Sequence, residues 1–155
     1  MITNEQLELM TKNKIVWVPT APLWPFINHP KLGLKIPKDL KGVTYQLCSK
    51  IRRANELGVN IALGSDNYFN SNEYGIEFGA ATLESLLFLH HCGLSPKQVI
   101  NAATVQASKL IGNQHIGHLK PGSYADFVVF ELDPIEDIKR LKKPIATYKS
   151  GVQVL

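Results

Sequence analysis

Cysteine is scarce in this chain, which has only Cys48 and Cys92 among its 155 residues. Neither belongs to a Cys-x-x-Cys pair or to a Cys/His spacing typical of structural zinc sites. Both fall in segments whose pattern predicts helices. We therefore expect two buried free thiols of a reducing compartment, rather than a disulfide or a zinc site.

Long apolar runs and blocks of like charge are also lacking. No apolar run approaches the length that spans a bilayer, and Glu5 and Glu8 interrupt any apolar region of a signal peptide. The net charge is a modest +4, and the one basic stretch, at 139–143, directly follows acidic residues. Such a stretch is typical of a solvated face rather than a nucleic-acid site. These absences predict a cytoplasmic protein that binds neither membranes nor nucleic acids.

The remaining composition, with 45% hydrophobic and 19% charged residues, is that of a globular protein of about one domain. Its most informative stretch is the apolar run 59–63, which continues into Gly64-Ser65-Asp66. In parallel α/β folds the chemistry lies at the carboxyl ends of the strands, where Asp66 falls. An Asp at a strand end can equally cap a helix or start a turn. The run alone leaves both interpretations of Asp66 open.

The segments before this run predict a βαβ unit. A helix over 3–12 starts with a capping box at Thr3. The strand 15–18 is almost wholly apolar, which is typical of a strand buried on both faces in a parallel sheet. A proline-containing loop over 20–41 and a helix over 43–57 lead back to the next strand.

The segments after Asp66 are predicted to be helical first and then β-rich. Helices are expected over 80–91, from Ser95 with a capping box, and from Thr104 to Gly112. Strands are expected over 125–132, 145–148 and 152–155, the last two joined by the turn Ser150-Gly151.

Several of these segments carry motifs of a known family. Residues 115–130 resemble the signature IGxLxPGxxADxVV, 133–138 are similar to DPLxDI, and 93–107 resemble the GLSP and AAT helices of the amidohydrolase superfamily. Residues 18–20 resemble its seventh barrel strand, and 63–66 resemble its eighth. Because the motifs occur in the right order along nearly the whole chain, the chain resembles the C-terminal portion of this superfamily. The nearest branch is the one of imidazolonepropionase and Xaa-Pro dipeptidase-like enzymes.

The resemblance implies an α/β fold: the last two βα units of a TIM-like (β/α)8 barrel plus part of a small β-sandwich subdomain. Residues 1–114 would form the partial barrel, and 115–155 the strands of the C-terminal β-subdomain. It also implies a metal-dependent hydrolase of amide, cyclic amide or dipeptide C–N bonds. Asp66 would ligate a divalent metal, zinc in first place, and take a proton from the attacking water. Asn67, Tyr68 and His29 are the candidate substrate-binding residues, although packing within their own loops is the alternative.

The other metal ligands that the family uses have no counterpart in this sequence, whereas a catalytic zinc takes about three protein ligands. His90 and His91 are neighbours on a helix and cannot share a metal, so we expect one in the core and one at the surface. His115 and His118 fall in a turn whose match to the family is structural.

Two hypotheses follow. The chain is either the C-terminal part of a hydrolase that is inactive alone, or a non-catalytic module. Two barrel strands and an unpartnered β-tail leave open edges and apolar faces. Both hypotheses therefore predict self-association or pairing with a chain that carries the N-terminal part.

Overall fold

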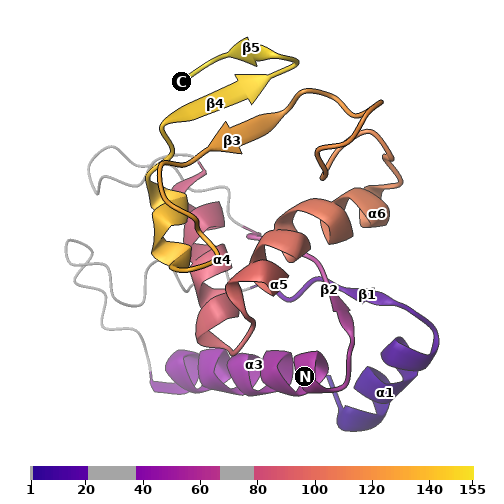
Figure 1. The fold of residues 1–155 in the computed structure, drawn as a ribbon. Helices are drawn as coiled ribbons and strands as arrows, with labels where there is room; N and C mark the ends of the chain where they lie inside the picture. The colour runs from indigo at the N-terminus through magenta and orange to yellow at the C-terminus, as the bar shows by residue number, and fades with distance from the viewer. Residues whose placement is uncertain (1, 21–37, 67–78) are drawn as a thin grey trace.

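The computed structural model describes residues 2–20, 38–66 and 79–155 (Figure 1). Its first half contains α1 (Asn4–Lys12), β1 (Val16–Trp17), α3 (Lys38–Glu56), β2 (Asn60–Ile61) and α4 (Ala80–His91). An interrupted helix follows, made of α5 (Pro96–Asn101), the π-turn η1 (Ala102–Gln106) and α6 (Ala107–Ile111). The last part contains β3 (Phe127–Val129), the 3-10 helix η2 (Ile138–Lys142), β4 (Ala146–Lys149) and β5 (Val152–Gln153). The three-stranded sheet lies at the opposite end of the molecule from α1 and α3 (Figure 1).

The two predicted capping boxes are confirmed. The Thr3 hydroxyl accepts a hydrogen bond from the Gln6 backbone N–H, and the Gln6 side chain accepts one from the Thr3 N–H. Ser95 and Gln98 make the same reciprocal pair at the start of α5. Each box satisfies backbone donors that a helix start otherwise leaves unpaired, so both helices begin where the sequence predicts.

Two helix boundaries differ from the prediction. Helix α3 begins at Lys38, so the last residues of the predicted 20–41 loop are helical. Thr104 does not cap a new helix but lies inside the π-turn, where its Oγ1 donates to the Ile100 carbonyl at 2.7 Å. A threonine hydroxyl can bond the carbonyl four residues back as readily as it caps a helix, and the sequence does not separate the two.

Strands β1 and β2 form the predicted parallel pair, with Val16 opposite Asn60 and Trp17 opposite Ile61. The N–H of Ala62 donates to the Trp17 carbonyl at 3.0 Å, which extends the ladder toward the carboxyl ends. The prediction that 15–18 is buried on both faces is wrong, because Val16 and Trp17 are half-buried and Ile15 is exposed. Within the described residues this sheet has two strands, so no further strand covers them.

The core lies between the helices and the first sheet. Its fully buried side chains include Leu7 of α1, Ile51 of α3, and Phe88 and Leu89 of α4. Ile138 of η2 joins the same cluster, so the C-terminal part contributes to this core.

The expectation of free thiols is wrong. The structure joins Cys48 of α3 and Cys92, at the end of α4, in a disulfide with the Cα atoms 4.8 Å apart. The two cysteines are 7% and 0% exposed, so the predicted burial is confirmed. Sequence spacing does not reveal the pair, because it arises only where α3 packs beside α4. The reducing compartment that we inferred from free thiols loses that support.

The C-terminal sheet is antiparallel in the order β3-β4-β5. Ser150 and Gly151 join β4 to β5 with φ angles of 51° and 80°. Two left-handed residues are typical of the tightest hairpin turn, so the predicted Ser150-Gly151 turn is confirmed. The Phe127 and Tyr148 rings stack across β3 and β4 with centroids 4.5 Å apart.

None of the helices in the described parts of the chain is long and apolar enough to cross a membrane.

Candidate functional site

Asp66 follows the carboxyl end of β2, two residues after Gly64. Beyond β1, Val18 packs against Gly64, which lies beyond β2: a Cβ at Gly64 would come within 2.5 Å of Val18 Cγ1. A side chain there would have to displace Val18, because real Cβ atoms essentially never approach other atoms so closely. Glycine therefore lets the two strand ends converge directly before Asp66.

The backbone of Asp66 is left-handed, with a φ of 48°, and the residue is exposed. Such a conformation costs a non-glycine residue about 1 kcal/mol or more, and Asp and Asn tolerate it best. Strained backbone often accompanies functional positions in proteins. An exposed carboxylate that follows the carboxyl end of a parallel strand is therefore available to a ligand.

The described residues do not complete a metal site around this carboxylate. Within residues 2–20, 38–66 and 79–155, no group of three or more His, Cys, Asp or Glu side chains is close enough to hold a metal ion. The three predicted substrate-binding residues, His29, Asn67 and Tyr68, lie outside the described residues. The structure thus places Asp66, and the roles of the three substrate-binding residues stay predictions.

Three histidines of the described chain hydrogen-bond near their own positions in the sequence. His90 Nδ1 pairs with the Leu94 carbonyl at 2.8 Å, His115 Nδ1 with the Gly122 carbonyl at 2.9 Å, and His118 Nδ1 with Ser123 Oγ at 3.2 Å. The structural interpretation of His115 and His118 agrees with these contacts. The expectation that one of His90 and His91 is in the core is wrong, because both are exposed in the last turn of α4.

Asp126, from the tail signature, fastens the hairpin to β3. Its carboxylate accepts hydrogen bonds from Lys149 Nζ and, at 2.7 Å, from the Ser150 N–H. The hydrogen bond from Lys149 and then that from the Ser150 N–H hold the pKa of Asp126 below its ordinary value of 3.8. The Asp126 carboxylate therefore has a structural role, because both of its oxygens accept hydrogen bonds from the hairpin.

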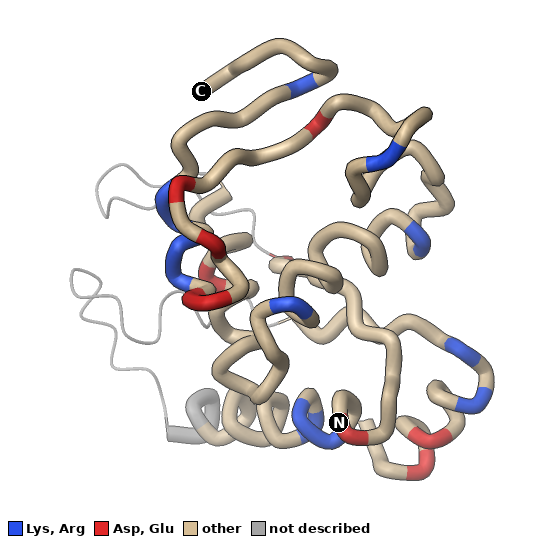
Figure 2. The backbone as a smooth tube through the Cα atoms, viewed as in Figure 1, with Lys and Arg blue, Asp and Glu red and all other residues tan. Residues whose placement is uncertain are grey.

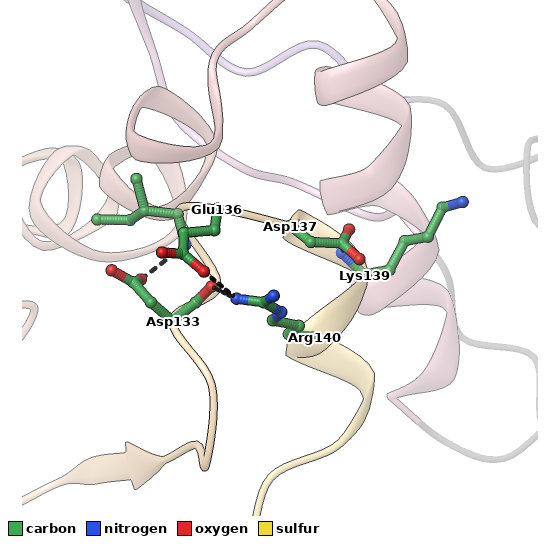
Figure 3. A network of polar contacts seen from close by, with 6 residues as sticks. Asp133, Glu136, Asp137, Lys139 and Arg140 are labelled. Atoms are coloured by element: carbon green, nitrogen blue, oxygen red, sulfur yellow. Dashed lines mark hydrogen bonds and ion pairs between the residues drawn. The ribbon is translucent and has the colours of Figure 1, made fainter.

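The second tail motif, 133–138, is also held by its own contacts. Arg140 Nη1 donates to the Asp133 carbonyl at 2.8 Å and to Glu136 Oε2 at 2.7 Å, as Figure 3 shows. Asp137 caps η2 by accepting from the Lys139 N–H. In Figure 2 the acidic residues of this segment lie next to the basic residues that follow them, and most of both are exposed, which agrees with the predicted solvated face.

An apolar hollow of about 720 Å³ separates the interrupted helix from the C-terminal sheet. Its walls come from α4 (Leu86), from the interrupted helix (Ala103, Ile111), from Leu119, which follows the 115–118 turn, and from β3 (Phe127). Ile111 and Leu119 are 66% and 76% exposed. The sequence predicts exposed apolar faces in general, but not this location, because the hollow forms between segments that are distant in the chain.

The family profile described as "Amidohydrolase family" matches residues 44–154. Ochratoxinase of Aspergillus niger is 35% identical over 148 residues, which cover 92% of this chain and 29% of the relative. Imidazolonepropionase of Geobacillus kaustophilus is 33% identical over 97 residues, which cover 60% of this chain and 22% of the relative. The chain therefore spans less than a third of the length of either relative.

Solved structures give the same result. A Xaa-Pro dipeptidase with methionine bound in its active site superimposes with a TM-score of 0.78 at 25% identity, over 98% of this chain and 37% of that chain. The A. niger ochratoxinase structure superimposes with a TM-score of 0.75 at 28% identity, over 97% and 34% of the two chains. The fold is thus the predicted partial α/β fold, a portion of the TIM-barrel fold of amidohydrolases. With matches along most of its sequence and nearly all of its structure, this chain belongs to the amidohydrolase family.

Proposed function

We propose that this chain is the C-terminal part of a metal-dependent hydrolase of C–N bonds in an amide, cyclic amide or dipeptide. The observation that carries the proposal is that Asp66 follows β2 and comes two residues after Gly64, which lies against Val18 beyond β1, in a chain of the amidohydrolase family. Residues 1–114 would contribute to the barrel, and residues 115–155 to a β-subdomain.

Amidohydrolases generally use divalent metals. The described residues by themselves do not fit a catalytic metal, which takes about three protein ligands, because Asp66 belongs to no group of three. We propose that Asp66 completes a site, of zinc in first place, whose other ligands come from protein outside this chain.

We also propose that Asp66 acts as a general base and then as a general acid. Its exposed carboxylate can accept the proton of a water molecule that attacks a substrate carbonyl, and can then deliver that proton to the leaving nitrogen. Asn67, Tyr68 and His29 are proposed as walls of the substrate pocket, because they come after the two strands in the sequence. The cytoplasmic location stays a prediction, and the Cys48–Cys92 disulfide argues against a reducing environment.

The test is complementation. The chain is co-expressed with the part of A. niger ochratoxinase that precedes the matched region, and also produced alone. The chain alone should not hydrolyse dipeptides or cyclic amides, whereas the co-purified assembly should do so and contain stoichiometric metal. Asp66→Asn should lower the rate by roughly 10²-fold or more and reduce the metal content. Glu131→Gln is the control, because it removes another exposed carboxylate, which follows β3 of the C-terminal sheet rather than β2. An Asp66→Asn assembly with an unchanged rate would refute the role of Asp66.

A second candidate is a non-catalytic module that self-associates or pairs with another chain. The apolar hollow beside the C-terminal sheet favours it, because such surface is unfavourable in water. Leu119→Glu should shift the chain toward a smaller species in size-exclusion chromatography with light scattering. Leu9→Glu, on the opposite side of the core in α1, is the matched control. A monomer in both the parent chain and Leu119→Glu would contradict this candidate.

A further inference from the structure

The helix that follows α4 is interrupted by the π-turn η1 (Ala102–Gln106). The helix continues through the π-turn, because the flanking Asn101 and Ala107 both have right-handed helical φ and ψ values. A π-turn carries one residue more than an α-turn and displaces the local carbonyl groups from the regular ladder. Single π-turns within α-helices occur frequently at functional sites.

One displaced carbonyl bonds to the strand that carries Asp66. The Leu63 N–H donates to the Ala102 carbonyl at 3.0 Å. The preceding amide, that of Ala62, donates to Trp17 in β1. Adjacent amides thus tie the end of β2 to β1 and to the π-turn, directly before Gly64, Ser65 and Asp66.

A glycine of the tail signature, Gly117, also lies against the π-turn. Gly117 has a φ of 81°, and a Cβ on it would lie 2.6 Å from the Thr104 carbonyl oxygen and 2.8 Å from Ser108 Cβ. Backbone and a short side chain cannot move out of the way cheaply. Gly117 therefore lies against the π-turn backbone with no room for a side chain.

We propose that Gly117 is a positioning residue for Asp66. Without a side chain it allows the 115–118 turn to pack against the π-turn, and the π-turn in turn holds the Leu63 amide at the end of β2. The tail thereby fixes the strand end that presents the carboxylate. The link to Asp66 rests on the proposed function, whereas the link to Leu63 does not.

The test compares three substitutions of left-handed glycines in this chain. Gly117→Ala adds both backbone strain and the clash with Thr104. Gly112→Ala and Gly122→Ala add similar strain, at φ angles of 72° and 87°, with nothing within 4 Å of the new methyl group. Amide hydrogen exchange is followed by NMR at Leu63, with Ala62 as the internal reference. We expect Leu63 to exchange at least about tenfold faster in Gly117→Ala than in either control, with Ala62 changed less. Equal effects of the three substitutions on Leu63 would overturn the proposal.

Deletion of Ala103 provides a variant without a clash, in case Gly117→Ala does not fold. Removing one residue converts a π-turn into a regular α-turn, so the helix stays continuous while the Ala102 carbonyl returns to the ladder. Leu63 should lose its protection in the folded deletion variant, and retained protection would overturn the proposal.

Kinetics of the complemented enzyme test separately whether Gly117 acts on the end of β2 and whether it positions Asp66. Gly117→Ala should lower kcat with little change in KM, and Gly122→Ala should change neither. Fast exchange at Leu63 with an unchanged kcat would overturn the positioning of Asp66. A parent assembly without hydrolysis would refute the proposed function, while the exchange of Leu63 would still decide whether Gly117 acts on β2.

Discussion

Reduction of the Cys48–Cys92 disulfide should destabilise this chain strongly. The bond connects residues 44 positions apart and closes a loop that contains β2 and Asp66. For a loop of that length, the chain-entropy relation gives a stabilisation of about 4 kcal/mol at 25 °C, because the cross-link restricts the unfolded chain. Domains are typically stable by about 5–15 kcal/mol, so the loss would be a large fraction of the total.

Equilibrium urea unfolding of the chain with and without dithiothreitol measures this loss. Mass spectrometry after alkylation, under denaturing conditions, counts the free thiols in each sample. We expect no alkylated cysteine in the untreated chain, two after reduction, and a free energy of unfolding lower by about 4 kcal/mol in the reduced chain.

The variants Cys48→Ala, Cys92→Ala and the double variant separate the bond from the packing of the sulfur atoms. Either single variant already removes the bond, so the second substitution should add only the small cost of one buried sulfur atom. Dithiothreitol should not affect any of the three. Two alkylatable thiols in the untreated chain, or unfolding midpoints that are insensitive to dithiothreitol, would refute the disulfide.

Three further predictions concern stability. Gly64→Ala should cost about 1–3 kcal/mol, because the new methyl group meets Val18, and adding Val18→Ala should recover part of the loss in urea unfolding. Ser95→Ala should cost about 1 kcal/mol through loss of the α5 cap, whereas Ser49→Ala, exposed in α3, should change the unfolding midpoint little. Asp126→Asn should lower stability at pH 7. Because folding lowers the pKa of Asp126, its contribution is complete above the ordinary value of 3.8 and is lost as pH falls through the lowered pKa. Urea midpoints of parent and variant should therefore converge toward low pH, and a gap that stays constant would contradict this assignment.

The local sequence predicted those features whose causes lie within a few residues. Capping boxes at Thr3 and Ser95 and the hairpin turn at Ser150-Gly151 depend on side-chain and backbone chemistry over three or four positions, and all three are present. The parallel pairing of β1 and β2 also followed, because two apolar strands joined through a helix form a parallel unit.

Features that depend on packing between distant segments were not predictable in this way. The free-thiol prediction was wrong because the meeting of Cys48 and Cys92 is decided by the packing of α3 against α4. The burial predicted for the strand 15–18 was wrong because burial depends on neighbours that the described chain does not supply. Thr104 was misplaced since a π-turn has no distinctive composition.

For the candidate site, the sequence by itself determined the family and the candidate catalytic residue. The sequence alone indicates Asp66, because this carboxylate follows an apolar strand and has ordered family motifs on either side of it. Only the tertiary structure decided how Asp66 is presented: by a left-handed backbone, by a glycine contact with Val18, and by a strand end bonded to a π-turn. The physical reason is that motifs record which side chains are present, whereas hydrogen bonds and close contacts between distant segments exist only once the chain has folded.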